Sequence, residues 1–165
     1  MRDPHARSQP MTALPRRPCR ALFSTLLAIA ACAGARAQGE PAQKLATIEL
    51  EAGGQAIEAE VARSERERTT GLMLRSSLPR DGGMLFVFGD PQRQCFWMHD
   101  TLIPLAAAFI SDDGRIVNVV EMAPRTEESH CSARPVRFVL EMNGEWFARH
   151  GVAPGDYVTG EPFTR

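Results

Sequence analysis

One short segment of the chain places an aromatic side chain beside two groups that titrate. Trp97 is followed after one residue by His99 and Asp100, where an apolar run gives way to a loop. Histidine gains and loses a proton near neutral pH, and a neighbouring carboxylate can orient it as a general base. The segment therefore predicts one of two arrangements. Either Trp97 packs in the core and His99 is a solvated loop residue with Asp100 as a turn former, or the three form an acid–base pair or the polar edge of an aromatic ligand platform. Consecutive strand residues point to opposite faces, so His99 and Asp100 converge only if the chain turns there.

Two more polar residues are candidates for the same site. Arg75 follows an expected helix and is either a surface cation or a planar donor that holds a carboxylate across the sheet or contacts a ligand. Glu141 lies on the strand face opposite the apolar side chains beside it. We therefore expect a ligand groove lined by Trp97, His99, Asp100 and Arg75, with Glu141 as a neighbour. In the alternative hypothesis, His99 is the catalytic base of a hydrolase or lyase, and Asp100 or Glu141 orients it.

Two cysteines lie in the part of the chain that we expect to be folded and exported. In an oxidising compartment Cys95 and Cys131 are expected to form a disulfide. It would close a loop of about 36 residues and stabilise the fold by roughly 3–4 kcal/mol. Free thiols are one alternative. Another is a copper site, because thiolate, thioether and imidazole ligands suit Cu(I). Its candidate ligands are Cys95, Met98, His99, His130 and Cys131.

The first 37 residues have the pattern of a secretory signal peptide. Basic residues precede an apolar run over residues 21–31, which is too short to span a bilayer, and an A-x-A cleavage site ends at Ala37. Cleavage after Ala37 would release a periplasmic or secreted protein. A competing lipobox over residues 29–32 would instead be cut before Cys32. The lipid on Cys32 would then anchor the chain to a bacterial membrane.

The rest of the chain reads as a polar linker over residues 38–43 and a single domain over residues 44–165. The whole chain has 19 basic and 20 acidic residues, of which six and one fall in the leader. The remaining 13 basic and 19 acidic residues give a net charge of −6. This charge argues against nucleic acid and anionic lipid as partners. Lys44 is the only lysine, so a lysine Schiff base or a lysine-containing phosphate loop is not expected.

Alternating apolar and polar residues predict a series of short strands. These cover residues 44–51, 55–62, 84–88, 94–98, 105–110, 115–122 and 136–142, with a last strand near Tyr157. A capping box at Ser64 starts a short helix toward Met73, and Asn143 is placed to cap a second helix that ends at His150. Residues 123–135 are expected to form a long loop. We therefore predict a mainly β fold, an antiparallel sandwich or open barrel of seven to eight short strands with two short helices.

Several strings occur in an order that resembles a known family. They are Arg68–Arg75, Gly83–Phe86, Phe96–Leu105, Asp113–Gly114, Ala123–Pro124, Arg137–Glu141, Gly151–Val152 and Gly155–Asp156. From about Lys44 to Tyr157 the chain resembles the bacterial and archaeal family called domain of unknown function 192, or uncharacterised protein family 0127. The resemblance implies a compact β-rich domain, often exported, with no agreed activity. The family usually has Lys-Asn where this chain has His99 and Asp100, so no family charge chemistry is carried over to these two positions.

Common catalytic motifs are absent from the sequence. It lacks G-x-S-x-G, H-E-x-x-H, G-x-G-x-x-G and C-x-x-C, so the common hydrolase, metalloprotease and nucleotide-binding types are not expected. We therefore favour a non-enzymatic domain of the cell envelope that binds a small ligand or a protein partner and needs no cofactor. The hydrolase or lyase and the copper-binding protein stay open as alternatives.

Overall fold

The computed structural model describes residues 42–163. The expected leader, both cleavage sites, Cys32 and most of the linker lie outside the described residues, so these remain predictions. Within residues 42–163 no helix is long and apolar enough to cross a membrane.

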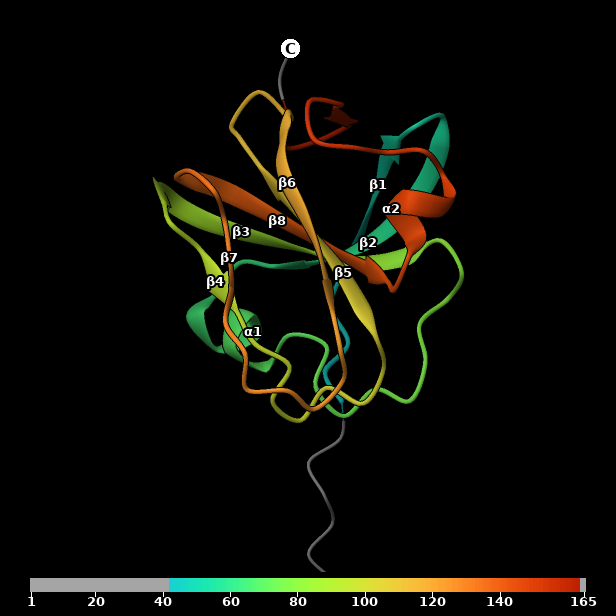
Figure 1. Cartoon of the computed structure of the whole chain (residues 1–165), viewed down its shortest axis with the longest axis vertical. Coiled ribbons are helices and arrows are strands. Elements are labelled where there is room, and N and C mark those ends of the chain that lie inside the picture. The colour runs from blue at the N-terminus through green and yellow to red at the C-terminus, as the bar shows by residue number, and fades with distance from the viewer. Residues whose placement is uncertain (1–41, 164–165) are drawn as a thin grey trace, which may run out of the picture. The chain divides into compact units, whose positions relative to one another are not determined.

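The described part of the chain consists mainly of β-strands (Figure 1). The strands are β1 Thr47–Ala52, β2 Gln55–Ala62, β3 Gly82–Gln92, β4 Cys95–Phe96, β5 Leu105–Ile110, β6 Ile116–Met122, β7 His130–Cys131, β8 Val136–Asn143 and β9 Val158–Thr159. The helices are α1 Glu65–Thr70 and α2 Trp146–Arg149. The predicted mainly β fold with two short helices is confirmed. The described residues contain nine strands instead of seven or eight, and the additional one is β7, which lies in the segment predicted as a loop.

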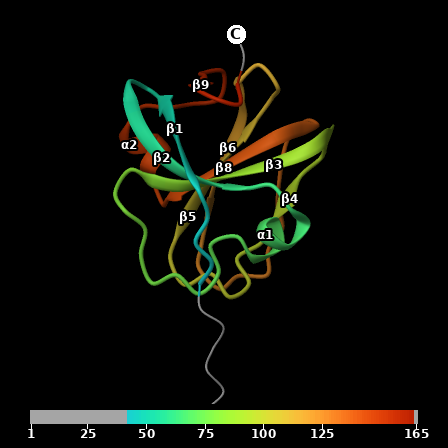
Figure 2. The same cartoon turned by 180° about the vertical axis from the view of Figure 1, so that it is seen from behind.

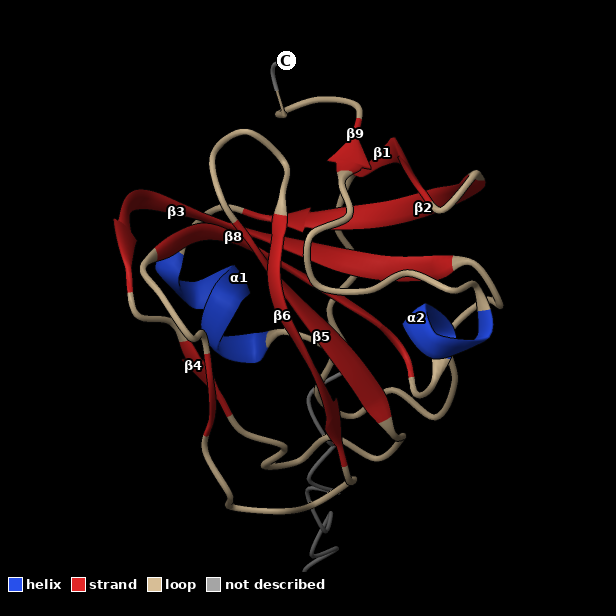
Figure 3. Ribbon diagram, turned by 45° about the horizontal axis from the view of Figure 1, so that its top comes forward, coloured by secondary structure: helices blue, strands red, loops and turns tan. Residues whose placement is uncertain are grey.

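Seven of the strands form one sheet in the order β6-β5-β8-β3-β2-β1-β9, and β4 pairs with β7 separately. The pairs are antiparallel except β2 with β3, which run parallel because the segment containing α1 returns the chain to the same end of the sheet. In Figures 2 and 3, β5 and β6 cross β1 and β2 steeply, so the sheet curls into an open half-barrel. The open-barrel alternative predicted from the sequence is therefore the one that forms, with one parallel pair inside it.

Local sequence signals explain the first turn and the first helix. Gly53 and Gly54 have φ values of 59° and 73°, which the tight turn between β1 and β2 requires. The Ser64 hydroxyl oxygen accepts a hydrogen bond from the backbone N–H of Glu67 at 3.2 Å, and the Glu67 carboxylate accepts one from the backbone N–H of Ser64 at 2.8 Å. This is the predicted capping box, and it sets the start of α1.

Both faces of the large sheet are covered, as β5 shows, because all six of its residues are buried. In β8, Leu140 and Met142 pack on one face together with Trp146 of α2. Val139 packs on the opposite face. Strand alternation directs Glu141 to this second face, where α1 and β4 lie.

Three elements differ from the prediction. The strand expected over residues 94–98 is limited to β4, and the expected loop over residues 123–135 contains its partner β7. A ladder of two residues is too short to produce an alternation pattern. Asn143 is not a helix cap: it ends β8, and its side-chain amide donates to the backbone oxygen of Pro79 at 2.7 Å. The helix α2 instead follows Glu145, which makes no side-chain cap.

Candidate functional site

A pocket of about 410 Å³ opens beside α1 on the second face of the sheet. Its walls are the end of α1 with the following turn, Phe86 and Phe88 of β3, and the segment 94–97 around β4. Thr101 and Glu141 also line it. The volume falls in the range of small-molecule sites, roughly 300–1,000 Å³. Trp97, a candidate from the sequence, is therefore a pocket residue, although 53% of its surface is exposed.

Glu141 is the buried carboxyl group of this pocket, with 4% of its surface exposed. Across the ladders it faces Met84 and Ala107, whose side chains cannot donate a conventional hydrogen bond. No donor in the described chain hydrogen-bonds its carboxyl group, and burial raises the pKa of Glu141 to about 8. Glu141 is therefore mostly protonated at neutral pH, and its polar atoms face the pocket without a partner from the described protein.

Aromatic rings form much of the apolar wall. Phe96 contacts Phe86 edge to face, with ring centroids 4.8 Å apart, and Phe88 in the same manner at 6.4 Å. The guanidinium of Arg68 lies over the Phe88 ring, 5.0 Å from its centroid, and donates to the backbone oxygen of Val87 at 3.1 Å. Because the rings hold one another in a favoured geometry, this wall is formed before any ligand arrives.

Trp97 and His99 stack, with ring centroids 5.0 Å apart and planes inclined by 19°. Nδ1 of His99 lies 2.8 Å from Oε1 of Glu127, and Nε2 lies 3.4 Å from Oδ2 of Asp100. Asp100 has a φ of 54°, so the chain turns there and the predicted pair does come together. The hydrogen bond with Glu127, followed by the charge of Asp100, raises the pKa of His99. Both ring nitrogens contact carboxylates, which favours the imidazolium and leaves neither nitrogen directed at the pocket beside α1.

Arg75 does not join this site. Its guanidinium donates to both carboxylate oxygens of Glu60, at 2.6 and 2.8 Å, and to the backbone oxygen of Gln43 at 2.5 Å. Its Nε is buried and has no hydrogen-bond partner among the described residues. Burial by itself would raise the pKa of Glu60, but the hydrogen bonds from Arg75 and from the Leu45 backbone lower it. Of the roles that the sequence left open, Arg75 has the carboxylate-holding one: it is not a surface cation, and it does not line the pocket near Trp97.

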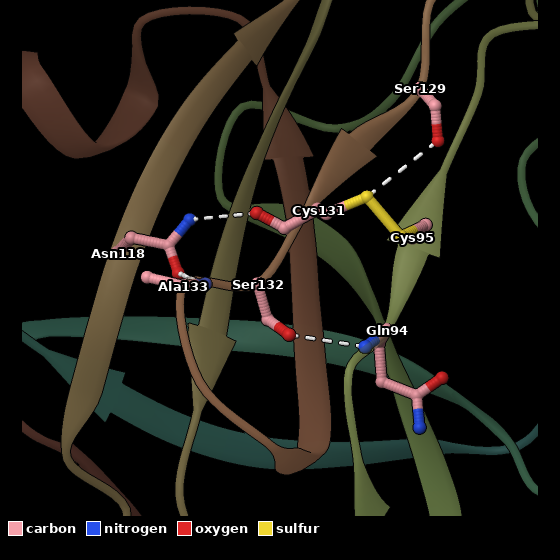
Figure 4. The surroundings of a disulfide bond; sticks show 7 residues. All are labelled: Gln94, Cys95, Asn118, Ser129, Cys131, Ser132 and Ala133. Atoms are coloured by element: carbon pink, nitrogen blue, oxygen red, sulfur yellow. Dashed lines mark hydrogen bonds between the residues drawn. A yellow bond between two sulfur atoms is a disulfide. The ribbon is translucent and has the colours of Figure 1, made fainter.

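The sulfur atoms of Cys95 and Cys131 are joined as a disulfide, 2.07 Å apart (Figure 4). The two residues face each other across the β4–β7 ladder, with Cα atoms 4.0 Å apart. Figure 4 also shows the Asn118 side chain donating to the backbone oxygen of Cys131 at 3.2 Å, and Ser132 Oγ accepting from the Gln94 backbone at 3.1 Å. Because Cys95 lines the pocket, these contacts hold one of its walls in place.

The residues considered as copper ligands do not converge. Both cysteine sulfurs belong to the disulfide, and Met98 is fully buried in the core. Nε2 of His130 is buried without a hydrogen-bond partner in the described chain, whereas His99 contacts carboxylates. Within residues 42–163, no three His, Cys, Asp or Glu side chains are arranged to hold a metal ion. A copper site here would first require the disulfide to be reduced.

The sequence gives no signal for the two carboxylates that pair with His99 and Arg75. Glu127 contacts His99 from 28 residues away along the chain, and Glu60 contacts Arg75 from 15 residues away. No local pattern marks either pairing. Phe86 belongs to a continuous apolar run, which indicates a buried strand and contains no signal for a pocket wall.

The family model DUF192, described as "Uncharacterized ACR, COG1430", matches residues 48–160. One similar solved structure is a protein of unknown function from Novosphingobium aromaticivorans DSM 12444. It has 34% sequence identity and a TM-score of 0.68, and the match covers 73% of this chain and 90% of that one. Another, from Sinorhizobium meliloti 1021, is named as a candidate transcription regulator. It has 34% identity and a TM-score of 0.66 over 74% of this chain and 98% of that one. Curated proteins give no match.

Proposed function

This chain belongs to the DUF192 family of uncharacterised proteins, and we propose that it is a non-enzymatic domain that binds a small ligand. The binding site in this proposal is the pocket beside α1, and the protein acts as an accessory component of the cell envelope. The observation that carries the proposal is Glu141. Glu141 has 4% of its surface exposed and lines the pocket, and its carboxyl group has no hydrogen-bond partner within the described residues.

The physical argument rests on what an unpaired carboxyl group costs. A buried polar group without a partner destabilises a fold by roughly 1–3 kcal/mol. Packing does not require a carboxyl group here, because Met84 and Ala107 beside Glu141 are apolar. A ligand that pairs with Glu141 would offset this cost, while the aromatic wall supplies apolar contact area. The lining also has polar side chains, among them Thr69, Thr70 and Gln94, and such groups fix the orientation of a ligand in small-molecule sites.

A thermal-shift screen of the wild-type protein against sugars, amino acids, amines, metals and nucleotides tests the proposal. A ligand present at about 100 times its Kd should stabilise the protein by about 3 kcal/mol. Trp97→Ala and Glu141→Gln should reduce the shift, because both residues line the pocket. Tyr157→Ala is the matched control, since Tyr157 is an exposed aromatic residue outside the lining. A silent panel, or a shift that survives both pocket variants, contradicts the proposal.

The other functions considered from the sequence have less support. The His99–Asp100 pair of the hydrolase or lyase hypothesis does form, but His99 does not line the pocket, and Glu127 contacts its other ring nitrogen. The cysteine sulfurs of the copper hypothesis are bonded to each other. Transcription regulation, the role in the name of the Sinorhizobium relative, is not proposed for this chain. Residues 38–165 of this chain contain 13 basic and 19 acidic side chains, and the resulting negative charge disfavours contact with DNA phosphates.

We also propose export to the periplasm or the medium, as a soluble protein cleaved after Ala37 or as a lipoprotein anchored through Cys32. The leader pattern supports export, and so does the Cys95–Cys131 disulfide, because disulfides persist in oxidising compartments. Mass spectrometry of the mature protein tests this. A first residue of Gln38 identifies the soluble form, and a diacylated Cys32 identifies the anchored form. Full-length protein recovered from the cytoplasm contradicts export.

A further inference from the structure

We propose that the ligand of the pocket is a small organic cation, a compound with an ammonium group attached to a short apolar chain or ring. The inference rests on the proposed function and specifies the chemical class of the ligand. The ammonium group pairs with the ionised carboxylate of Glu141, and the apolar part contacts the phenylalanine rings.

Among residues 42–163, Glu141 has none of the hydrogen-bond partners that an ionised carboxylate needs. Its cross-strand neighbours Met84 and Ala107 are apolar. The hydroxyl group of Thr101, also in the lining, donates to the backbone oxygen of His99 at 3.4 Å. An ammonium ligand supplies both several N–H donors and the opposite charge, and charge-assisted hydrogen bonds are the stronger ones. A ligand anion would instead lie beside a second acidic group, which repels it once Glu141 is ionised.

The aromatic wall favours the same sign of charge. The face of an aromatic ring attracts a cation that lies within about 6 Å of the ring centroid. One ring of the pocket already binds a cation in this way, since the Arg68 guanidinium lies 5.0 Å from the centroid of Phe88. Arg68 also donates to the backbone oxygens of Arg63 and Val87, and these contacts keep its charge on α1 and β3. The other aromatic rings of the lining are those of Phe86, Phe96 and Trp97.

The charged side chains of the lining have a net charge of −1 when Glu141 is ionised. Besides Glu141, they are Glu65 and Arg68, both on α1. The strands β3 and β4 contribute only uncharged side chains to the lining, and β5 is apolar throughout. With Glu141 ionised, the lining holds two acidic groups and one basic group. A ligand with a single positive charge therefore complements it.

Isothermal titration calorimetry with benzylamine, benzyl alcohol and benzoate varies the charge while keeping the shape similar. At pH 8 we expect benzylamine to bind at least about tenfold more tightly than benzyl alcohol, and benzoate to bind more weakly than both. Glu141→Gln is nearly isosteric and cannot ionise. In this variant the affinity for benzylamine should fall to that for benzyl alcohol, while the affinity for the alcohol stays within about threefold of wild type.

The pH dependence gives a readout that a purely structural role for Glu141 would not move. Benzyltrimethylammonium has a permanent charge, so only the protein titrates. Because the pKa of Glu141 is about 8, the affinity for this probe should rise by about tenfold per pH unit from pH 6 toward pH 8 and then level off. Glu128→Gln removes an exposed carboxylate outside the lining and should keep this profile, whereas Glu141→Gln should abolish it.

Equal affinities for benzylamine and benzyl alcohol overturn the cation assignment and leave the pocket as a site for neutral ligands. Undiminished binding of benzylamine to Glu141→Gln also overturns it. If none of the benzyl probes binds, the assignment fails as well. The proposed function itself fails only when the wider thermal-shift panel is also silent.

Discussion

Replacing Glu141 with glutamine should stabilise the protein by an amount that grows with pH. In the folded chain, burial raises the pKa of Glu141 from 4.5 to about 8. Between these two values the folded state retains a proton that the unfolded state releases. The contribution of protonated Glu141 to the unfolding free energy of the wild type is fully present below pH 4.5. It is lost progressively as the pH rises from there through about 8.

The magnitude follows from the difference between the two pKa values. One pKa unit corresponds to about 1.4 kcal/mol. At pH 7, ionisation in the unfolded state therefore lowers the wild-type unfolding free energy by about 3 kcal/mol, and at pH 9 by about 5 kcal/mol. The glutamine of the Glu141→Gln variant does not ionise in either the folded or the unfolded state. Its unfolding free energy should exceed that of the wild type by these amounts at pH 7 and pH 9, and should equal it near pH 4.

Urea unfolding, followed by circular dichroism at pH 4, 7 and 9, measures this difference. Glu60→Gln is a matched control of opposite sign. Although Glu60 is buried, Arg75 lowers its pKa, so its contribution is present above the unfolded pKa and is lost as the pH falls through the folded one. Glu60→Gln should therefore destabilise the protein at pH 7, with a penalty that shrinks in acid. If the Glu141→Gln and wild-type curves run parallel from pH 4 to pH 9, the Glu141 carboxyl group is hydrated or paired, and the reasoning is refuted.

Three further predictions concern the disulfide, His99 and Arg75. Cys131→Ser should lower the unfolding free energy by about 3–4 kcal/mol in urea and weaken benzylamine binding, because it releases the β4 wall; unchanged binding would mean that the wall holds without the disulfide. NMR titration should place the pKa of His99 above its ordinary 6.5, and Glu127→Gln should lower it; an identical value in both proteins would contradict the hydrogen bond between them. Arg75→Ala should cost about 3 kcal/mol, since it leaves Glu60 buried without its partner, and a loss below about 1 kcal/mol would contradict a buried pair.

The parts of the fold that could be predicted are those whose signal lies within a few residues. The Gly53-Gly54 turn and the Ser64 capping box are local because each requires one backbone conformation and one short-range hydrogen bond. The opposite orientation of Leu140 and Glu141 is also local, since it follows from the strand pleat. Local signals cannot predict β7, because its two residues form a strand only by pairing with β4, 36 positions earlier in the sequence.

The sequence by itself determined the mainly β class, the family resemblance and the side of its strand on which Glu141 lies. Only the tertiary structure decided that this side is covered by α1 and β4, which makes the carboxyl group a buried pocket residue with a raised pKa. It also decided that Arg75 contacts Glu60 instead of the Trp97 site. The physical reason is that alternation is a property of neighbouring backbone units. Burial and charge pairing depend instead on strand order and sheet curl, which are set by contacts between residues far apart in the sequence.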